Sequence, residues 1–270
     1  MTANDILRHL FPLCPWVNPD TIWDRVISGD GDKPIARTLV AWQSTQKAIA
    51  HAIAGGFDLL ITHEPTYWGY SDAHERELHF LSHPDDYRLP DEKLRLLHES
   101  GLVVLRLHDT WDRFPVHGVP YAWARHLGFC APPSAVSDDG YLLAFDVPEQ
   151  PARQYAAGIA RACALLGEPA VQFVGSDTAP VRRIGVGTGC VCDPQAFWRM
   201  GCDLCVTTDD GLWYWGPLSC AIDLDAPVVR VNHRTSEEPG MQSLAAYLRN
   251  TLQMQAEYFY EGCSYRLVQG

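Results

Sequence analysis

The chain has 270 residues, 47% of them hydrophobic and 20% charged, so it is long and apolar enough to form a globular core. Its 33 Asp and Glu residues outnumber its 21 Lys and Arg residues, and the net charge of −12 disfavours nucleic acid as a partner. No apolar run reaches the roughly 18 residues that a membrane-spanning helix needs. The N-terminal segment carries Asp5, Arg8 and His9 among apolar residues. It resembles an amphipathic helix and not a signal peptide, which predicts a cytoplasmic protein.

Predicted strands and helices alternate along the first 130 residues. The sequence predicts a helix that starts at Ser44 as N-cap and stops at Gly55 and Gly56. The order is strand 38–42, helix 44–56, strand 58–62, helix 89–101, strand 102–108 and helix 118–129. This alternation predicts a mainly parallel sheet with helices packed on it.

Residues 131–140 are rich in Pro, Ser and Asp and predict a linker between an N-terminal lobe, 1–130, and a C-terminal lobe, 141–270. The second lobe repeats the alternation. Its predicted strands are 141–147, 171–175, 181–186 (ending in a glycine-rich turn), 203–208, 226–233 and a closing strand 264–269, and its predicted helices are 150–167, 194–201 and 236–253. The fold class expected is therefore α/β, with two lobes that have mainly parallel or mixed sheets.

Nine cysteines are expected to be thiols in a cytoplasmic protein. Four of them cluster in sequence: Cys190, Cys192, Cys202 and Cys205. A zinc site would use such residues, but zinc ribbons space two C-x-x-C pairs farther apart. The favoured interpretation is that these thiols are small buried hydrophobic residues, with zinc as the alternative.

Three predicted strands end in a histidine with a carboxylate nearby. His63 and Glu64 follow the strand 58–62, Asp112 follows the strand that ends near His108, and the strand 226–233 ends at His233 and leads to Glu237. Ligands gather at the carboxyl ends of parallel strands, so these side chains are candidates for one metal-binding cluster. A single strand-end histidine is more often structural, and chance placement of some of the 11 histidines is the alternative.

Several motifs together resemble the Nif-three-like family, also described as GTP cyclohydrolase I type 2-like proteins. ITHEP (61–65) is similar to the family's first metal segment, T/S-H-H-P after a strand, and LHDTWD (107–112) is similar to its H-T-x-x-D segment. GVPYAWARHLGF (118–129) resembles the helix that follows. GCDLCVTTDD (201–210) and VNHRTSEEPGMQSLAAYL (231–248) resemble the later and closing segments.

The resemblance implies two related α/β lobes, a dinuclear metal site in the cleft between them, and commonly a toroidal hexamer. It places metal ligands at His63, Glu64, Asp112, His233 and Glu237. The expected cofactors are divalent ions, two per chain, drawn from Zn, Mn, Fe, Co or Ni. Glu64 stands where the family usually has a second histidine, and its harder oxygen donor shifts the preference toward Mn, Fe or Mg. Thr208 stands where the family usually has glycine, which weakens the case for Asp209 as an acidic helper.

The function expected is a metal-dependent hydrolase that acts on a nucleotide-like or other small-molecule substrate, with Glu64 or Asp209 as proton shuttle. A non-catalytic metal carrier, sensor, or assembly or regulatory protein would use the same ligands and is the alternative. A homo-oligomer is expected, and the aromatic stretch GLWYWGPL (211–218) is a candidate for its interface. Tyr67 and Trp68 are candidates for stacking on a planar substrate.

Overall fold

The computed structural model describes residues 1–18, 20, 23–66 and 91–268, and the chain divides into two compact units. Unit 1 comprises Met1–Phe114 and Met241–Tyr260, and unit 2 comprises Pro115–Gly240 and Glu261–Gly270. The segment 131–140, predicted as a linker, lies within unit 2 and contains the short strand β5 (Ala135–Val136). Each unit is built around its own sheet, so the α/β class predicted from the sequence is confirmed.

Among its described residues, unit 1 has a five-stranded sheet with the order β1-β4-β3-β2-β11. Strands β4, β3, β2 and β11 are parallel, and β1 pairs antiparallel with β4. The strands are β1 (Arg25–Ser28), β2 (Arg37–Ala41), β3 (Leu59–Thr62), β4 (Val103–Arg106) and β11 (Gln255–Tyr258). The helices are α1 (Ala3–Leu10), α2 (Gln46–Ala54), α4 (Asp91–Ser100) and α5 (Asp109–Asp112), with a 3-10 turn at Phe11–Leu13.

Helix α2 begins one residue later than the sequence predicted. The Thr45 hydroxyl accepts a hydrogen bond from the Ala48 N–H at 3.1 Å, so Thr45 is the N-cap and the expected cap, Ser44, is wrong. The helix stops where Gly56 adopts a φ of +65°, a conformation that suits glycine because it has no Cβ.

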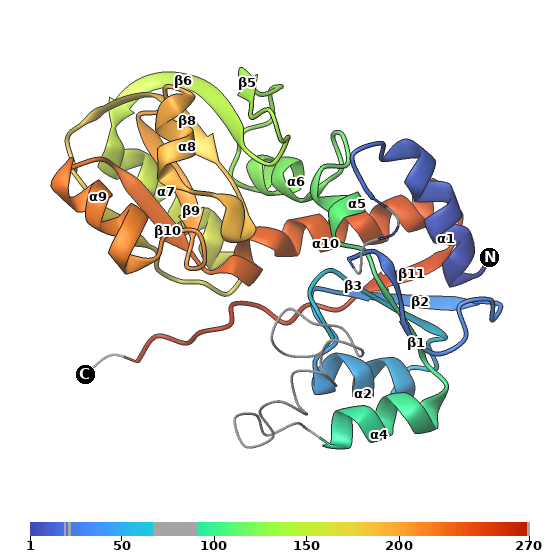
Figure 1. Ribbon diagram of the computed structural model, residues 1–270. Helices are drawn as coiled ribbons and strands as arrows, with labels where there is room; N and C mark the ends of the chain where they lie inside the picture. Colours follow the sequence, from blue (N-terminus) through green and yellow to red (C-terminus); the bar gives the residue numbers. More distant parts are fainter. Residues whose placement is uncertain (19, 21–22, 67–90, 269–270) are drawn as a thin grey trace. The chain divides into compact units, whose positions relative to one another are not determined.

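The core of unit 1 lies between the sheet and the helices α2 and α4, which cover the same face (Figure 1). All four residues of β3 and of β4 are buried, as expected for central parallel strands covered on both faces. The buried members of this core are Leu39, Ala41, Ala48, Ile49, Ala52, Phe57, Leu60, Leu97, Leu102 and Val104. Burial on this scale fixes the carboxyl ends of β3 and β4, which carry His63 and His108.

Among its described residues, unit 2 has a six-stranded mixed sheet with the order β5-β6-β8-β9-β10-β7. Strands β8, β9 and β10 are parallel, and the other pairs are antiparallel. The strands after β5 are β6 (Leu143–Pro151), β7 (Gln172–Val174), β8 (Pro180–Val186), β9 (Leu204–Thr208) and β10 (Val228–Val231). The helices are α6 (Val119–His126), α7 (Ala152–Ala164), α8 (Pro194–Arg199) and α9 (Ser219–Asp223). The helix α10 (His233–Asn250) starts in unit 2 and ends in unit 1.

Two apolar clusters cover the two faces of the sheet in unit 2. One face packs on α6 and α7 through residues such as Trp123, Ile159 and Val206. The other face packs on α8 and α9 through residues such as Phe197 and Cys205. The sheet is therefore buried on both sides, which holds the carboxyl ends of β9 and β10 in fixed positions.

The two units repeat one arrangement of strands. Strands β2, β3, β4 and β1 follow one another across the sheet of unit 1, and β8, β9, β10 and β7 follow one another across that of unit 2. In both sets three parallel strands lie side by side, and an antiparallel strand pairs with the third of them. This antiparallel strand comes before the other three in the sequence. The register pairs Thr62 with Arg106 in unit 1 and Thr207 with Arg230 in unit 2. The match supports the expectation of two related lobes.

Three elements differ from their prediction. The closing strand expected at 264–269 is wrong for the described residues, since 264–268 form no strand and the last strand is β11. The helix expected from residue 236 begins at His233. The strand expected at 226–233 ends at Val231, because Asn232 and His233 turn away to start the helix. None of the helices in the described part of the chain is long and apolar enough to cross a membrane.

Candidate functional site

In unit 1, two neighbouring strands bring a set of nitrogen and oxygen donors together. His63 and Glu64 follow β3, His108 follows β4, and the single turn of α5 carries Asp112. His63 Nε2 lies 3.2 Å from Asp112 Oδ1, and His63, Glu64 and His108 each offer an atom within 4.8 Å of the others. His63 is fully buried, and Asp112 is 6% exposed. The strand ends therefore form a compact cluster of candidate metal ligands.

Backbone contacts hold the tip of β3 rigidly. The N–H groups of His63 and Glu64 both donate to the Trp42 carbonyl, at 3.1 and 2.9 Å. The buried Arg106 donates from Nε to the His63 carbonyl at 2.9 Å. Donors on such a strand end keep their geometry more closely than donors on a loop with few contacts.

The hydrogen bond at Nδ1 fixes the tautomer of His63. Nδ1 lies 3.1 Å from the Leu107 carbonyl, which can only accept, so Nδ1 carries the proton in the neutral ring. Nε2 then presents a lone pair to Asp112. Two acceptors that face each other at 3.2 Å repel unless a cation or a proton lies with them. A divalent ion within about 2.0–2.2 Å of both atoms satisfies this geometry.

His108 belongs to the same cluster, although it is absent from the ligand set inferred from the sequence. Its ring stacks on that of His63 with centroids 4.5 Å apart, and its Nδ1 lies 2.8 Å from Asp109 Oδ1 and 3.2 Å from Asp112 Oδ2. Burial alone would lower the pKa of His108, but the nearby carboxylates, chiefly Asp112, raise it above its usual value. The predicted strand 102–108 ended at His108, which was a signal for this residue, but its contact with Asp112 needed the structure.

A buried carboxylate, Asp24, holds the backbone after β4. Asp24 Oδ1 accepts hydrogen bonds from the His108 N–H at 2.9 Å and from the Thr110 hydroxyl at 2.6 Å. Burial raises the pKa of this carboxyl. Asp24 lies just before β1, a strand that the sequence analysis did not predict, so sequence reasoning missed it.

In unit 2, one helical turn supplies two donors. His233 and Glu237 are four residues apart at the start of α10, on one face, and His233 Nε2 lies 3.1 Å from Glu237 Oε1. His233 Nδ1 lies 2.6 Å from Asp210 Oδ2, so in the neutral ring the proton sits on Nδ1 and Nε2 presents a lone pair to Glu237. The hydrogen bond to His233 is the main reason that the pKa of Asp210 is lowered. Sequence reasoning missed Asp210, whose partner is 23 residues away.

Asp209 holds the start of α10. Its Oδ1 accepts the His233 N–H at 2.8 Å, and its Oδ2 accepts from the Asn232 side-chain amide at 2.8 Å. A carboxylate at a helix N-terminus satisfies a free N–H group and interacts favourably with the helix dipole. Both oxygens are therefore engaged, which fits a structural role better than the proton-shuttle role expected for Asp209.

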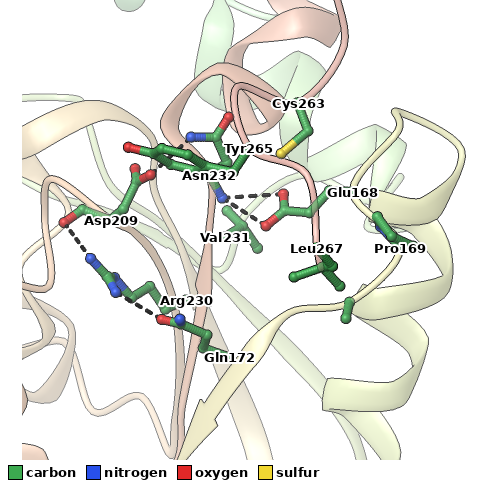
Figure 2. A pocket seen from close by; sticks show the side chains of 11 residues that line it. Glu168, Pro169, Gln172, Asp209, Arg230, Val231, Asn232, Cys263, Tyr265 and Leu267 are labelled. Carbon is green, nitrogen blue, oxygen red and sulfur yellow. Dashed lines mark hydrogen bonds between the residues drawn. The ribbon is translucent and has the colours of Figure 1, made fainter. Parts of the chain in front are cut away.

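A pocket of about 310 Å³ lies beside Asp209, within unit 2. Figure 2 shows Arg230 donating to Gln172 and to the Asp209 carbonyl, and the C-terminal residues Tyr265 and Leu267 lining the pocket across from Arg230. Glu168 accepts the Asn232 N–H with both oxygens, at 2.9 and 3.1 Å. The pocket has mixed charge, and its lining carboxylates are already hydrogen-bonded to the protein.

The donor sets of both units fit divalent metal ions. Each pairs an imidazole Nε2 with a buried carboxylate oxygen at 3.1 or 3.2 Å, and in each the Nδ1 atom is bonded to an acceptor. Metal-binding histidines almost always have such an acceptor on the other ring nitrogen, because it fixes the tautomer and the ring orientation. The clusters of His, Glu and Asp could therefore bind metal. His63, Glu64 and Asp112 lie in unit 1, and His233 and Glu237 lie in unit 2.

The clustered cysteines lie apart from these donor sets. Cys192, Cys202 and Cys205 are buried and Cys190 is exposed. Burial raises the pKa of the Cys202 thiol to about 12 and raises that of Cys205 well above its usual value. In the described part of the chain, no group of candidate metal ligands includes a cysteine. Cys192, Cys202 and Cys205 belong to the apolar cluster with Phe197, which agrees with the interpretation of packing residues.

A model of the Duf34/NIF3 (NGG1p interacting factor 3) family matches residues 1–261. The chain belongs to this family. The resemblance stated from the motifs is thereby confirmed. A comparison with curated proteins finds no match.

Several solved structures share the fold. The Staphylococcus aureus protein SA1388 has 18% identity and a TM-score of 0.77, with 99% of each chain covered. A Bacillus cereus protein related to NIF3 has 13% identity and a TM-score of 0.74, also with 99% of each chain covered. Reduced HcgD from Methanocaldococcus jannaschii has 17% identity and a TM-score of 0.70, with 96% of this chain and 97% of that chain covered. At these identities the likeness shows the fold alone.

One further expectation falls outside the described residues. Tyr67 and Trp68, the candidates for stacking on a planar substrate, lie in the segment 67–90, which the structure does not describe. The aromatic stretch 211–218 is described, and its Trp213, Tyr214 and Trp215 are exposed on unit 2 at 56%, 57% and 83%. These three side chains are therefore surface residues of this unit.

Proposed function

We propose that this NIF3 protein binds divalent metal ions, two per chain, through His63, Glu64, Asp112, His233 and Glu237, and uses them to hydrolyse a small substrate. The observation that supports the proposal is the distance of 3.1–3.2 Å between an imidazole Nε2 and a buried carboxylate oxygen, found in both units. Such pairs are electrostatically unfavourable unless a cation or a proton lies between the two atoms. His108 joins the set in unit 1 as an additional nitrogen donor.

The donor chemistry narrows the choice of metal. Imidazole nitrogens with carboxylate oxygens suit Zn, Mn, Fe, Co or Ni, whereas all-oxygen sets suit Mg or Ca. Glu64 takes the place of a nitrogen donor with a harder oxygen, which favours Mn or Fe over the softer choices. Because Glu64 and Asp112 add negative charge, the set in unit 1 favours binding of a cation over a neutral ligand.

The residues divide the work of hydrolysis between them. A bound divalent ion supplies Lewis acidity, which polarises a substrate oxygen and lowers the pKa of water toward neutrality. Asp210 keeps the His233 ring oriented through its hydrogen bond at 2.6 Å. Of the two candidates for the proton shuttle, Asp209 has both carboxylate oxygens engaged in hydrogen bonds. The half-buried Glu64 is therefore the carboxylate proposed to accept the proton. The sequence carries no P-loop or purine-reading motif, and the proposed substrate is a nucleotide-like or other small molecule that offers a hydrolysable oxygen-linked or amide bond.

Elemental analysis of the protein purified without chelator tests the metal-binding step, with the single variants H63A and D112A for comparison. We expect about two equivalents of a divalent transition metal in the wild type and a clear loss in both variants. A metal-free wild type that also takes up no added Mn²⁺, Fe²⁺ or Zn²⁺ would refute the proposal.

A panel of nucleotides, phosphoesters and amides tests the hydrolytic step on metal-loaded protein. Turnover that depends on added metal and disappears in H63A is the expected result. Rapid transfer of the metal to an acceptor chelator or protein, without turnover of any compound, would instead identify a metal carrier.

The homo-oligomer expected from the family resemblance, commonly a toroidal hexamer, is part of the same proposal. Trp213, Tyr214 and Trp215 support it as an exposed apolar patch of the kind that protein interfaces cover. Light scattering coupled to size exclusion measures the mass. A monomer at micromolar concentration would rule the hexamer out.

A further inference from the structure

The loop after β8 passes close to the donor pair of unit 2 at one glycine. Gly189 adopts a φ of +61°, and a Cβ built on it would lie 3.2 Å from Glu237 Oε1 and 3.5 Å from His233 Nε2. Both are the atoms assigned to the metal. A side chain at this position would therefore occupy space next to both donor atoms. Glycine leaves that space open, and the left-handed backbone also favours glycine.

Buried hydrogen bonds fix Gly189 in this place. Its carbonyl accepts from the Thr208 hydroxyl at 2.6 Å and from the Cys192 thiol at 2.9 Å. The Thr208 oxygen in turn accepts the Gly211 N–H at 3.0 Å, and the Cys192 sulfur accepts the Thr208 N–H at 3.2 Å. Thr208 and Cys192 are both fully buried. A carbonyl held by two buried donors cannot move away to make room for a side chain without leaving those donors unsatisfied.

Thr208 occupies the position in unit 2 that His63 occupies in unit 1. Thr208 follows Thr207 at the end of β9, as His63 follows Thr62 at the end of β3. Thr207 and Thr62 are equivalent because each pairs with an arginine on the next parallel strand. In unit 1 this position holds a donor for metal. In unit 2 it holds a hydroxyl whose hydrogen bonds go to the loop that faces the donors.

We infer that Gly189 is a positioning residue that keeps the coordination space beside His233 Nε2 and Glu237 Oε1 open, and that Thr208 and Cys192 hold it there. The inference rests on the proposed metal binding. This space is proposed to hold an ion and a small exchangeable ligand such as water. A single extra carbon at residue 189 would fill it. Neither Thr208 nor Gly189 carries a side-chain atom assigned to the metal.

A glycine-to-alanine pair tests the space directly. Co²⁺ is titrated into metal-free protein and followed by its visible absorption, which reports the ligands around the ion and not the stability of the fold. For G189A we expect Co²⁺ affinity to fall about tenfold or more, in the range found when the partner of a metal ligand is lost. G201A is the matched control, because Gly201 has a φ of +75° in the same unit but only Arg183 Nη1 near its Cβ position, at 3.7 Å. G201A carries a similar backbone cost, but no atom assigned to the metal lies near its Cβ position. Its Co²⁺ affinity should therefore stay within about twofold of wild type.

A threonine pair tests the anchor and covers the case in which G189A folds poorly. T208V removes the hydroxyl that donates to Gly189, and T208S keeps it. We expect T208V to weaken Co²⁺ binding about fivefold and T208S to restore most of it, as for other residues that orient metal ligands. Equal Co²⁺ affinity and absorption in wild type, G189A and T208V would overturn the inference while leaving metal binding intact. A wild type that binds no Co²⁺ would overturn both.

Discussion

The stretches 58–64 and 203–209 occupy equivalent places in the two units and end differently. Both begin with an aspartate that accepts two successive backbone N–H groups from the neighbouring strand: Asp58 from Ala36 and Arg37, and Asp203 from Arg182 and Arg183. Both then run as buried parallel strands, β3 and β9. The first ends in His63 and Glu64, and the second in Thr208 and Asp209. The same scaffold thus presents metal-type donors in one unit and supporting hydrogen bonds in the other.

The next strand shows the same contrast. After β4, the His108 N–H donates to Asp24, and after β10 the Asn232 N–H donates to Glu168, at 2.9 Å in both cases. In unit 1 the histidine donors follow strand ends, and His63 has a backbone carbonyl as its Nδ1 partner. In unit 2 the donors stand on a helix, and His233 has a carboxylate as its partner. A carboxylate partner increases the basicity of the ring more than a carbonyl does, so the two histidines should respond differently to mutation.

The largest expected effect is that of H63A on metal binding. Loss of a ligand should weaken binding more than loss of an outer partner, so we expect about a 100-fold or greater rise in the dissociation constant. Isothermal titration with Mn²⁺ measures it. H98A, which changes an exposed histidine of the same unit, is the control. Unchanged Mn²⁺ affinity in H63A would contradict the contrast drawn between the ends of β3 and β9, because His63 would then be no more a metal ligand than Thr208.

The T110V variant should lower the free energy of unfolding by about 2 kcal/mol, since it removes a buried hydrogen bond to a carboxylate that also holds His108. The Thr110 hydroxyl lies 2.6 Å from Asp24 Oδ1. Urea unfolding monitored by circular dichroism measures the change. T178V, at an exposed threonine of unit 2, should differ from wild type by no more than about 0.5 kcal/mol. Similar losses in the two variants would contradict this account of Asp24.

D210N sharpens the difference between the two histidines. Asparagine can still accept the His233 hydrogen bond but lacks the charge that makes the ring more basic, so metal affinity should fall about tenfold. His63 offers no equivalent variant because its partner is a backbone carbonyl. Competition with a chelator of known affinity measures the change, and D223N at an exposed aspartate is the control. An effect as small as that of D223N would mean that the carboxylate adds nothing beyond what a carbonyl provides.

The smallest effect concerns Asp58 and depends on pH. Burial raises the pKa of Asp58, but its hydrogen bonds from Ala36 and Arg37 and the nearby Lys33 outweigh this and lower it. A lowered pKa in the folded state stabilises the fold above the unfolded value of about 4, and this stabilisation is lost as pH falls through the folded pKa. D58N should therefore lower the free energy of unfolding by about 1 kcal/mol at pH 7, a modest value because the group is partly exposed.

Thermal unfolding from pH 7 to pH 3 measures the effect of D58N. The gap between D58N and wild type should narrow below about pH 4, where wild-type Asp58 takes up a proton. D138N, at an exposed aspartate of unit 2, serves as the control. A gap that widens on acidification would show that the sign assigned to Asp58 is wrong.

The central parallel strands could be predicted from sequence because they are buried on both faces. β3 and β4 read as continuous apolar runs, and the polar residues that follow them mark their ends. The edge strands could not. β1 is only half-buried at every position, and β11 has one buried residue, Ala256, between two exposed ones, so neither carries a strong apolar pattern. Edge strands take their stability from one neighbour, and the sequence does not name that neighbour.

The residue type and position of the donors at strand ends could be predicted from the sequence. The residues that form hydrogen bonds with them could not. His63 and Glu64 stand out because an imidazole and a carboxylate follow an apolar run. Their role as ligands stays a prediction. Asp24 and Asp210 act through contacts with residues 84 and 23 positions away, and nothing in their local sequence indicates this. Thr208 is similar: its hydroxyl matters because Gly189 comes close in space.

The path of the chain has a consequence for how the protein is made. The strand β11, which pairs with β2 in unit 1, ends at Tyr258, whereas nearly all of unit 2 precedes it. During synthesis the five-stranded sheet must wait for its last strand until nearly all of unit 2 has left the ribosome, while the six-stranded sheet can close earlier. Until then β2 exposes an unpaired edge, and a truncated product that stops before residue 255 would keep that edge available for aggregation.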